Sequence, residues 1–340
     1  MHALHLFYHL PRLTSFAYEI LRVTLANIFI IPILPKITTI FSESVKSFAA
    51  SSSGVSVTFN SGKPTESYDL LVAADGLGSH IRGTLLNAPP RDSMHDEGVH
   101  VAYFTIKKDL LKGEKLAKGI SAVGGRNLMI RPDPHPSGRC SALLMNMTSP
   151  GKDSPAKARL NEALKGGNES YKTLLSELYK DIGWLGPEVL EAMKTSDDFY
   201  CSLFAQVRSP ILSDDTGRVV LLGDAGYATP GMGTSLAIIG GYMLAGELLT
   251  HQNDISAAVK RYETQIKPFV KENQGDFPAM QLLNPQTAWG LKVRDWVLWA
   301  VAGLRIPQAA VWCMGTFGIV EKKFKMAAYP WPGGVGTVKV

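Results

Sequence analysis

Asp224 is the residue whose position most clearly predicts chemistry. It follows a short apolar run, Arg218 to Leu222, which is typical of a strand with both faces buried. It precedes a loop that contains Gly231 and Gly233, and the apolar residues beyond that loop recur at helical spacing. A carboxylate at the carboxyl end of a strand can accept hydrogen bonds from the hydroxyls of a ligand, while the N-terminus of the next helix favours a phosphate or another anion.

The helix after this loop is expected to run as far as Leu249. Thr234 and Ser235 are placed to cap it, because short hydroxyl side chains can accept hydrogen bonds from the first N–H groups of a helix. The whole segment is therefore predicted to be a strand, an acidic turn and a helix.

A second motif, ADGLGSHIR, follows another predicted strand and contains Asp75, Gly76, Ser79 and Arg82. The glycines allow a tight turn from strand to helix, and Ser79 is placed to cap that helix. Arg82 lies on the first turns, where it could pair with Asp75. A turn followed by a capped helix, with no ligand, is the alternative interpretation.

Together these motifs resemble the FAD-binding signatures of the class A flavoprotein monooxygenases, the para-hydroxybenzoate hydroxylase-like group. The resemblance implies that Asp224 holds the ribityl chain and that the helix after it points at the flavin and the pyrophosphate. The motif at Asp75 matches one linked to FAD and to the pyridine nucleotide, and Arg22 matches an arginine that reaches the cofactor, although an ordinary surface arginine is the alternative there. The cofactor-binding residues implied in this way are Arg22, Asp75, Gly76, Arg82, Gly223, Asp224, Gly231, Gly233 and Thr234.

The resemblance implies an α/β fold, with a Rossmann-like FAD-binding domain and an inserted antiparallel-sheet substrate domain. The expected boundaries are 1–91 and 208–275 for the two parts of the FAD-binding domain, 92–207 for the substrate domain and 276–340 for a helical C-terminal extension. The predicted strands are 37–48, 55–59, 68–73, 99–106, 119–130, 139–147, 199–206 and 218–222, and the predicted helices include 19–29, 154–166, 168–181 and 255–274.

Tyr200 and Gln206 are the candidates for the substrate cavity, because the matching segment of the family lies beside the flavin. Tyr200 could equally be a plain aromatic residue of a strand. No residue is assigned as a catalytic acid or base. The implied reaction consumes NADPH or NADH and molecular oxygen and oxidises a small organic substrate, which by fold analogy is aromatic or polyketide-like.

The GxGxxG unit that opens the family's FAD-binding domain is missing from this sequence, so the first βαβ unit is expected to be incomplete. A truncated gene model or a degenerate paralogue would explain its absence. Two alternatives to a monooxygenase therefore stay open. One is a flavin-free paralogue that acts as a binding protein, and the other is a flavin oxidoreductase that transfers no oxygen.

Composition excludes several other classes of protein. A hydrophobic content of 45% is typical of a globular chain, and the net charge of +5 is too diffuse to indicate nucleic-acid binding. The three cysteines lack metal-ligand spacing, and the histidines near the N-terminus lack a carboxylate partner, so no metal site is predicted. Unpaired cysteines favour a reducing, cytoplasmic location, and the tryptophan-rich C-terminal extension leaves weak association with a membrane surface open.

Overall fold

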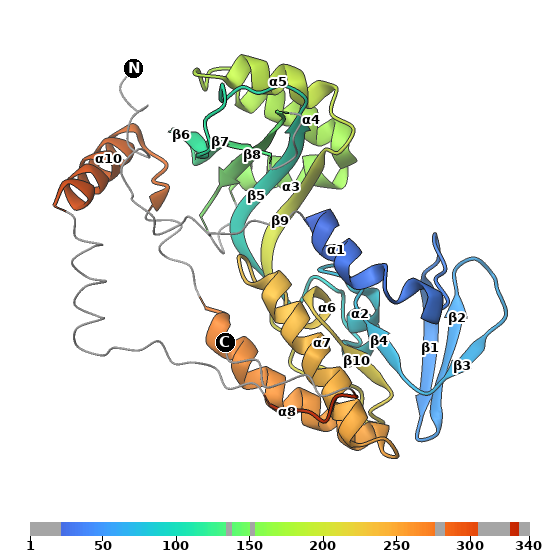
Figure 1. Cartoon of the computed structure of the whole chain (residues 1–340). Coiled ribbons are helices and arrows are strands. Elements are labelled where there is room, and N and C mark those ends of the chain that lie inside the picture. Colours follow the sequence, from blue (N-terminus) through green and yellow to red (C-terminus); the bar gives the residue numbers. More distant parts are fainter. Residues whose placement is uncertain (1–21, 134–137, 150–153, 276–282, 305–326, 333–340) are drawn as a thin grey trace. The chain divides into compact units, whose positions relative to one another are not determined.

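The computed structural model describes residues 22–133, 138–149, 154–275, 283–304 and 327–332 (Figure 1). These residues divide into two units. One unit comprises the described residues within 1–36, 97–204 and 277–323, and the other comprises those within 37–96, 205–276 and 324–340. Two of the points at which the chain passes from one unit to the other lie within strands, β5 (Met94–Ile106) and β9 (Tyr200–Val207).

A pair of parallel strands is the part of the second unit that positions the candidate site. β4 (Leu71–Ala73) pairs with β10 (Val219–Leu221), and all three residues of β10 are buried, as the apolar run predicted. Each strand leads into helices. α2 (His80–Leu86) follows β4, whereas α6 (Asp224–Tyr227), α7 (Gly233–Thr250) and α8 (Ile255–Asn273) follow β10.

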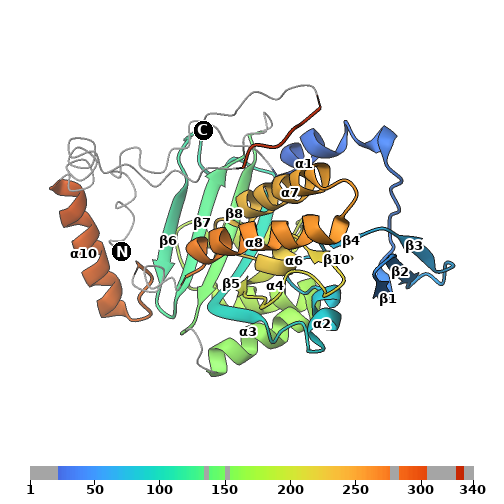
Figure 2. The ribbon, with the colours of Figure 1, turned by 90° about the horizontal axis from the view of Figure 1, so that it is seen from below.

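The long helices α7 and α8 lie side by side in both ribbon views (Figures 1 and 2). Their apolar side chains share a core with β4 and β10. A three-stranded antiparallel sheet completes this unit, and it is built from β1 (Val45–Ser51), β2 (Gly54–Phe59) and β3 (Glu66–Tyr68).

The first unit is organised around a five-stranded sheet in the order β6-β7-β8-β5-β9. Figure 2 shows β6 (Lys118–Ala122), β7 (Arg126–Pro132) and β8 (Cys140–Met147) next to one another. One face of this sheet forms a core with α3 (Pro155–Lys165), α4 (Gly167–Leu178) and α5 (Gly186–Lys194). The remaining described helices of the unit are α1 (Arg22–Ile30), the 3-10 helix η2 (Leu34–Lys36) and α10 (Ala288–Gly303).

Three expected elements differ from the structure. The strand predicted over 119–130 is the hairpin β6–β7, because Gly124 and Gly125 turn the chain with φ of 85° and 73°. A Cβ on Gly125 would lie 2.2 Å from the backbone oxygen of Met147, so this turn requires a glycine. The strand predicted over 68–73 is divided between β3 and β4, which belong to different sheets, and the strand predicted from 37 begins only at Val45.

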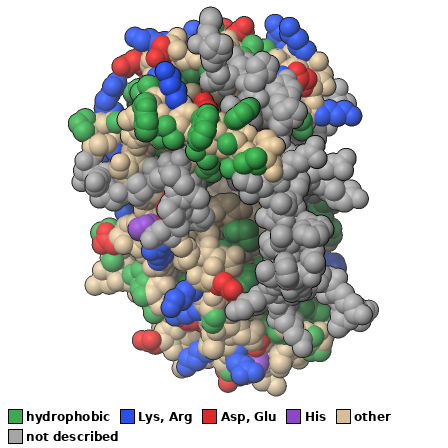
Figure 3. All heavy atoms as spheres, turned by 90° about the vertical axis from the view of Figure 1, so that its left-hand side faces the viewer, with side chains coloured by type: hydrophobic (Ala, Val, Ile, Leu, Met, Phe, Trp, Pro, Cys, Tyr) green, Lys and Arg blue, Asp and Glu red, His purple; other side chains and the backbone are tan. Residues whose placement is uncertain are grey.

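Helix α10 exposes three tryptophans, Trp289, Trp296 and Trp299. Hydrophobic side chains gather toward the top of the face drawn in Figure 3. In the part of the chain that the structure describes, no helix has both the length and the apolar character that a bilayer span requires. Association with a membrane surface stays a prediction.

Candidate functional site

The two sequence motifs begin at the same edge of the parallel strand pair. Ala73 and Leu221 are register partners, and the backbone N–H of Leu222 donates to the oxygen of Ala73 at 2.9 Å. Because parallel strands end side by side, the turns that carry Asp75 and Asp224 leave from one edge. This is the position at which α/β sheets commonly bind ligands.

Gly223 makes the turn at the end of β10 with φ 61° and ψ −137°. This is a conformation that residues with a Cβ rarely adopt. A Cβ at this position would also lie 3.2 Å from the Cβ of Ala237. The N–H groups of Gly226 and Tyr227 both donate to the Gly223 oxygen, at 3.0 and 2.9 Å, and these bonds form the short helix α6. A glycine at 223 therefore fixes the direction in which Asp224 leaves the strand.

The Asp224 carboxylate is exposed and lies against the start of α7. A Cβ on Gly233 would lie 3.2 Å from Oδ1 of Asp224, so the absent side chain of Gly233 leaves room for the carboxylate. Gly231 is exposed with φ 80° and has open space where a Cβ would be, so it serves the turn and not close packing. A carboxylate and two glycines thus form an accessible loop at a helix N-terminus.

Helix α7 begins without a side-chain cap. Its N-cap residue is Met232, so the prediction that Thr234 and Ser235 cap this helix is wrong, and both residues lie inside the first turn. The N-cap residue makes no side-chain hydrogen bond to the first N–H groups of this 18-residue helix, and these groups are oriented toward the loop. They carry the positive end of the helix dipole, which favours an anion. Thr234 is exposed and adds a hydroxyl to the same turn.

The motif at Asp75 forms the predicted capped turn. The Ser79 hydroxyl accepts a hydrogen bond from the backbone N–H of Arg82 at 3.0 Å, so the prediction of a Ser79 cap on α2 is confirmed. Gly76 turns the chain with φ 80°, and Oδ2 of the exposed Asp75 accepts a hydrogen bond from the N–H of Ile81 at 3.3 Å. The Asp75 side chain therefore supports the start of α2 and stays accessible.

Arg82 is fully buried, and its guanidinium group connects the two motifs. It donates to the backbone oxygen of Ala225 at 2.6 Å and to the oxygens of Leu77 and Pro90, both at 2.7 Å. The predicted direct pairing with Asp75 is replaced by these bonds. Burial lowers the pKa of Arg82 and the nearby Asp75 charge opposes that change, so the guanidinium stays protonated. Arg82 thus ties the first motif to the residue next to Asp224.

Tyr227 and Tyr262 support the Asp224 turn, and no pattern in the sequence predicted this role. Their hydroxyls lie 3.0 Å apart, and the hydroxyl of Tyr262 donates to the oxygen of Leu221 at 3.1 Å. A Cβ on Gly240 of α7 would lie only 1.9 Å from the Tyr227 hydroxyl. The available signal was a glycine inside a strongly helical pattern, which often indicates close packing.

The substrate-cavity candidates Tyr200 and Gln206 differ sharply in environment. Tyr200 begins β9 and is 55% exposed, whereas Gln206 is fully buried and its Nε2 donates to the oxygen of Gly275. Residues six apart in a strand point to the same face but lie roughly 20 Å apart, so these two side chains do not converge. Arg22 begins α1, and the structure describes only its backbone.

The residues around Asp224 fit FAD. Its ribityl chain carries hydroxyl donors, which an exposed carboxylate can accept. Its pyrophosphate is an anion, which an uncapped helix N-terminus favours. Glycines at 231 and 233 keep side chains out of the loop, so a ligand can approach the backbone closely. No group of three or more residues suitable for a metal occurs among the described residues.

Comparisons with known proteins identify the family of the chain. No protein-family model matches the sequence. The chain is 32% identical over 327 residues to the monooxygenase CTB7 of Cercospora beticola, and the match spans 93% of this chain and 74% of that protein. It is 27% identical over 336 residues to the FAD-dependent monooxygenase asL4 of Sarocladium schorii, across 92% of this chain and 75% of the relative. Among solved structures, the tetracycline destructase Tet(51) is 26% identical with a TM-score of 0.63, covering 84% of this chain and 73% of that one. The chain belongs to the family of FAD-dependent monooxygenases.

Proposed function

We propose that this chain binds FAD at the Asp224 loop and uses NADPH or NADH and molecular oxygen to oxygenate a small organic substrate, aromatic or polyketide-like. The observation that carries the proposal is the exposed Asp224 carboxylate beside Gly233, at the uncapped N-terminus of α7. A hydroxyl-rich anionic cofactor suits both features, because an exposed carboxylate can accept hydrogen bonds from hydroxyls and the helix end favours negative charge.

Each residue of this loop has a separate task in the proposal. Asp224 accepts hydrogen bonds from the ribityl hydroxyls, and the first N–H groups of α7 stabilise negative charge on the cofactor. Gly231 and Gly233 leave space for close approach, and Thr234 offers a hydroxyl. Bound FAD supplies the redox chemistry that activates oxygen after its reduction by the nicotinamide.

The motif at Asp75 acts mainly by positioning. Arg82 holds the oxygen of Ala225 and thereby the turn that presents Asp224. Asp75 and Gly76 are accessible on the same edge of the strand pair, where they contribute to the cofactor site. Arg22 is assigned to the same cofactor on the family resemblance alone.

A Rossmann-like FAD-binding domain with an inserted substrate domain is the finer architecture that we assign. The parallel pair β4–β10 supports the first domain, since it comes from segments on either side of the five-stranded sheet. The proposed parts are 1–91 and 208–275 for FAD binding, 92–207 for the substrate sheet and 276–340 for the C-terminal extension.

The five-stranded sheet offers an apolar face for a flat substrate. Side chains on the face away from α3, α4 and α5 include the half-buried Tyr103, Leu143 and Met145 and the partly exposed Met129, and by strand alternation Tyr200 belongs to this face. Aromatic rings and methionines pack well against planar apolar molecules. The similar structure Tet(51) is named a tetracycline destructase, which supports a polyketide-like substrate.

Isotope labelling tests the reaction. The FAD-loaded chain would be incubated with NADPH, ¹⁸O₂ and a panel of tetracycline and hydroxylated anthraquinones, and the products analysed by mass spectrometry. We expect NADPH consumption coupled to a product that carries one labelled oxygen atom. Consumption of NADPH that yields only hydrogen peroxide with every compound would instead indicate a flavin reductase.

A further inference from the structure

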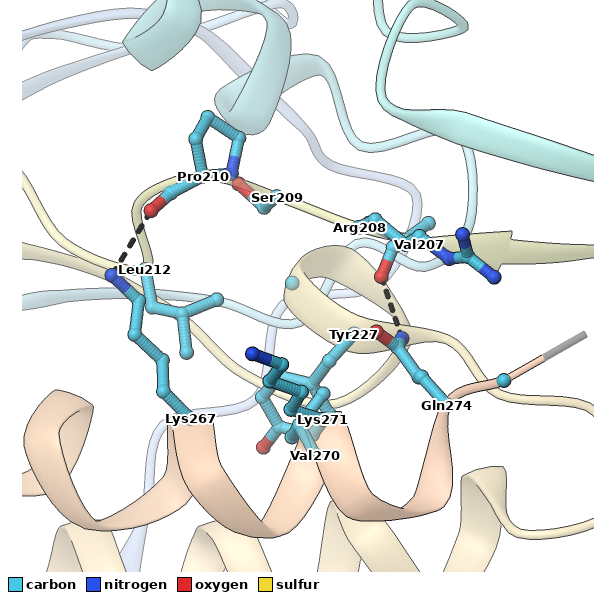
Figure 4. Close-up of a pocket in the computed structure, with 12 residues that line it drawn as sticks. Val207, Arg208, Ser209, Pro210, Leu212, Tyr227, Lys267, Val270, Lys271 and Gln274 are labelled. Carbon is cyan, nitrogen blue, oxygen red and sulfur yellow. Dashed lines mark hydrogen bonds between the residues drawn. The ribbon is translucent and has the colours of Figure 1, made fainter.

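A cavity of about 610 Å³ lies in the second unit, between α8 and the segment from Val207 to Leu212 (Figure 4). Its volume is within the range of pockets that hold small organic molecules. Gly226 and Tyr227 of α6 contribute to its lining, but Asp224 does not, so the cavity is separate from the proposed cofactor loop.

Two hydrogen bonds fix the walls of this cavity. Nζ of Lys267 donates to the oxygen of Pro210 at 2.9 Å, and Nε2 of Gln274 donates to the oxygen of Val207 at 2.8 Å. Gln274 also donates to the oxygen of Ala228 at 3.2 Å. Figure 4 draws the bonds to Pro210 and Val207 at opposite ends of the cavity. Because α8 and its C-cap residue are tied to the opposite segment at both ends of the cavity, the space between them is pre-formed.

Lys271 lies between these two attachments. Lys267 and Lys271 are four residues apart, so their side chains share one face of α8, and Gln274 is the C-cap residue just beyond the helix. Figure 4 shows the Lys271 side chain between those of Lys267 and Gln274. Lys267 is already paired with Glu263 at 2.5 Å, whereas Lys271 makes no hydrogen bond or ion pair with any residue that the structure describes. The middle cation of this face is therefore available to a ligand.

The lining combines positive charge with apolar surface. Arg208, Lys267 and Lys271 contribute to it, and no described carboxylate side chain does. Leu212 and Val270 supply buried aliphatic surface. A ligand that matches such a lining carries one anionic group and an apolar body, because a lone inorganic anion would leave the aliphatic walls facing water.

We propose that this cavity is an accessory binding site for a small organic carboxylate with an aromatic or aliphatic body, whose carboxylate pairs with Nζ of Lys271. The site does not depend on FAD, since none of its lining residues belongs to the Asp224 loop from 231 to 234. Its test can therefore fail or succeed independently of the proposed function.

Calorimetric titration of the 340-residue chain with 2-naphthoate tests the proposal, since this probe is a fused aromatic ring with one carboxylate. We expect binding at one site that Lys271→Gln weakens about fivefold, the effect typical of a partly exposed ion pair. Lys260→Gln is the matched control, because Lys260 is an exposed lysine of the same helix outside the cavity. Neutral 2-naphthylmethanol should also bind at least about fivefold more weakly than 2-naphthoate, for the same reason.

A second variant separates loss of charge from loss of shape. Lys271→Arg keeps the positive charge and should bind 2-naphthoate within about twofold of the unaltered chain. Circular dichroism would verify that each variant is folded. Equal affinity of the unaltered chain and Lys271→Gln, or no measurable binding of 2-naphthoate to the unaltered chain, would overturn the proposal.

Discussion

The two strand–turn–helix segments of the second unit begin alike and end differently. Both leave the carboxyl edge of the β4–β10 pair through a turn that contains an aspartate and a glycine with positive φ. The first enters α2, a helix of 7 residues that Ser79 caps and that buries Arg82. The second enters α6 and then α7, a helix of 18 residues with no side-chain cap and with Asp224 exposed at its start.

The first segment therefore positions the backbone, whereas the second presents a carboxylate to solvent. In the first segment the guanidinium of Arg82 is buried and donates its hydrogen bonds to backbone oxygens, one of which belongs to Ala225. In the second segment the Asp224 side chain is exposed, and the N-cap residue of α7 makes no side-chain hydrogen bond to the helix. The same local fold can therefore stabilise a turn or display it to a ligand, depending on whether its charged side chain is buried, as Arg82 is, or exposed, as Asp224 is.

Replacing Arg82 should have the largest effect on stability. Arg82→Met keeps most of the side-chain volume but leaves three backbone oxygens without their donor, so we expect a loss of about 3 kcal/mol or more in the free energy of unfolding. Urea denaturation would measure it. Arg91→Met, at an exposed arginine, is the control and should change stability by less than about 0.5 kcal/mol. Equal stability of the two variants would show that Arg82 does not hold the segments together.

Two adjacent glycines of α7 provide the next test. A Cβ on Gly240 would overlap the Tyr227 hydroxyl at 1.9 Å, whereas a Cβ on Gly241 would contact nothing within 4 Å. Gly240→Ala should destabilise the protein by about 2 kcal/mol through overpacking beneath the Asp224 turn. Gly241→Ala should stabilise it by about 0.5 kcal/mol, because alanine favours a helix. Thermal or urea unfolding with the same sign for both variants would contradict this packing.

The smallest expected effect distinguishes the two helix starts. Ser79→Ala removes the cap of α2 and should cost about 1 kcal/mol of unfolding free energy. Thr234→Ala, at the start of α7, should leave stability unchanged within about 0.5 kcal/mol, because α7 has no side-chain cap to lose. A comparable loss in Thr234→Ala would mean that a side chain caps α7 after all.

Local patterns in the sequence predicted local structure. The buried run before Asp224 and the Ser79 cap are confirmed, since each depends on residues within one turn or one strand. The predicted cap of α7 and the predicted single strand over 119–130 were wrong. In both places a glycine turn, at 231 and at 124–125, outweighed the local preference of the neighbouring residues.

Contacts between residues far apart in the sequence could not be predicted from sequence patterns. Arg82 binds the oxygen of Ala225, 143 residues away, and a backbone oxygen has no residue type to indicate it. The cavity beside α8 likewise depends on Lys267 and Gln274 reaching backbone oxygens of a separate segment. The roles in cofactor binding of residues such as Arg22, Gly223 and Asp224 stay predictions that only ligand binding can test.

The visible absorption spectrum of the chain after incubation with excess FAD and desalting tests the central claim most directly. The matched variants are Asp224→Ala and Asp215→Ala, since Asp215 is an exposed aspartate outside the loop. We predict flavin absorbance that the unaltered chain and Asp215→Ala retain, with at least about tenfold weaker retention in Asp224→Ala, because hydrogen bonds to a charged group are lost. A chain that never retains flavin, or an Asp224→Ala variant that retains it fully, would contradict the assignment of the cofactor to this loop.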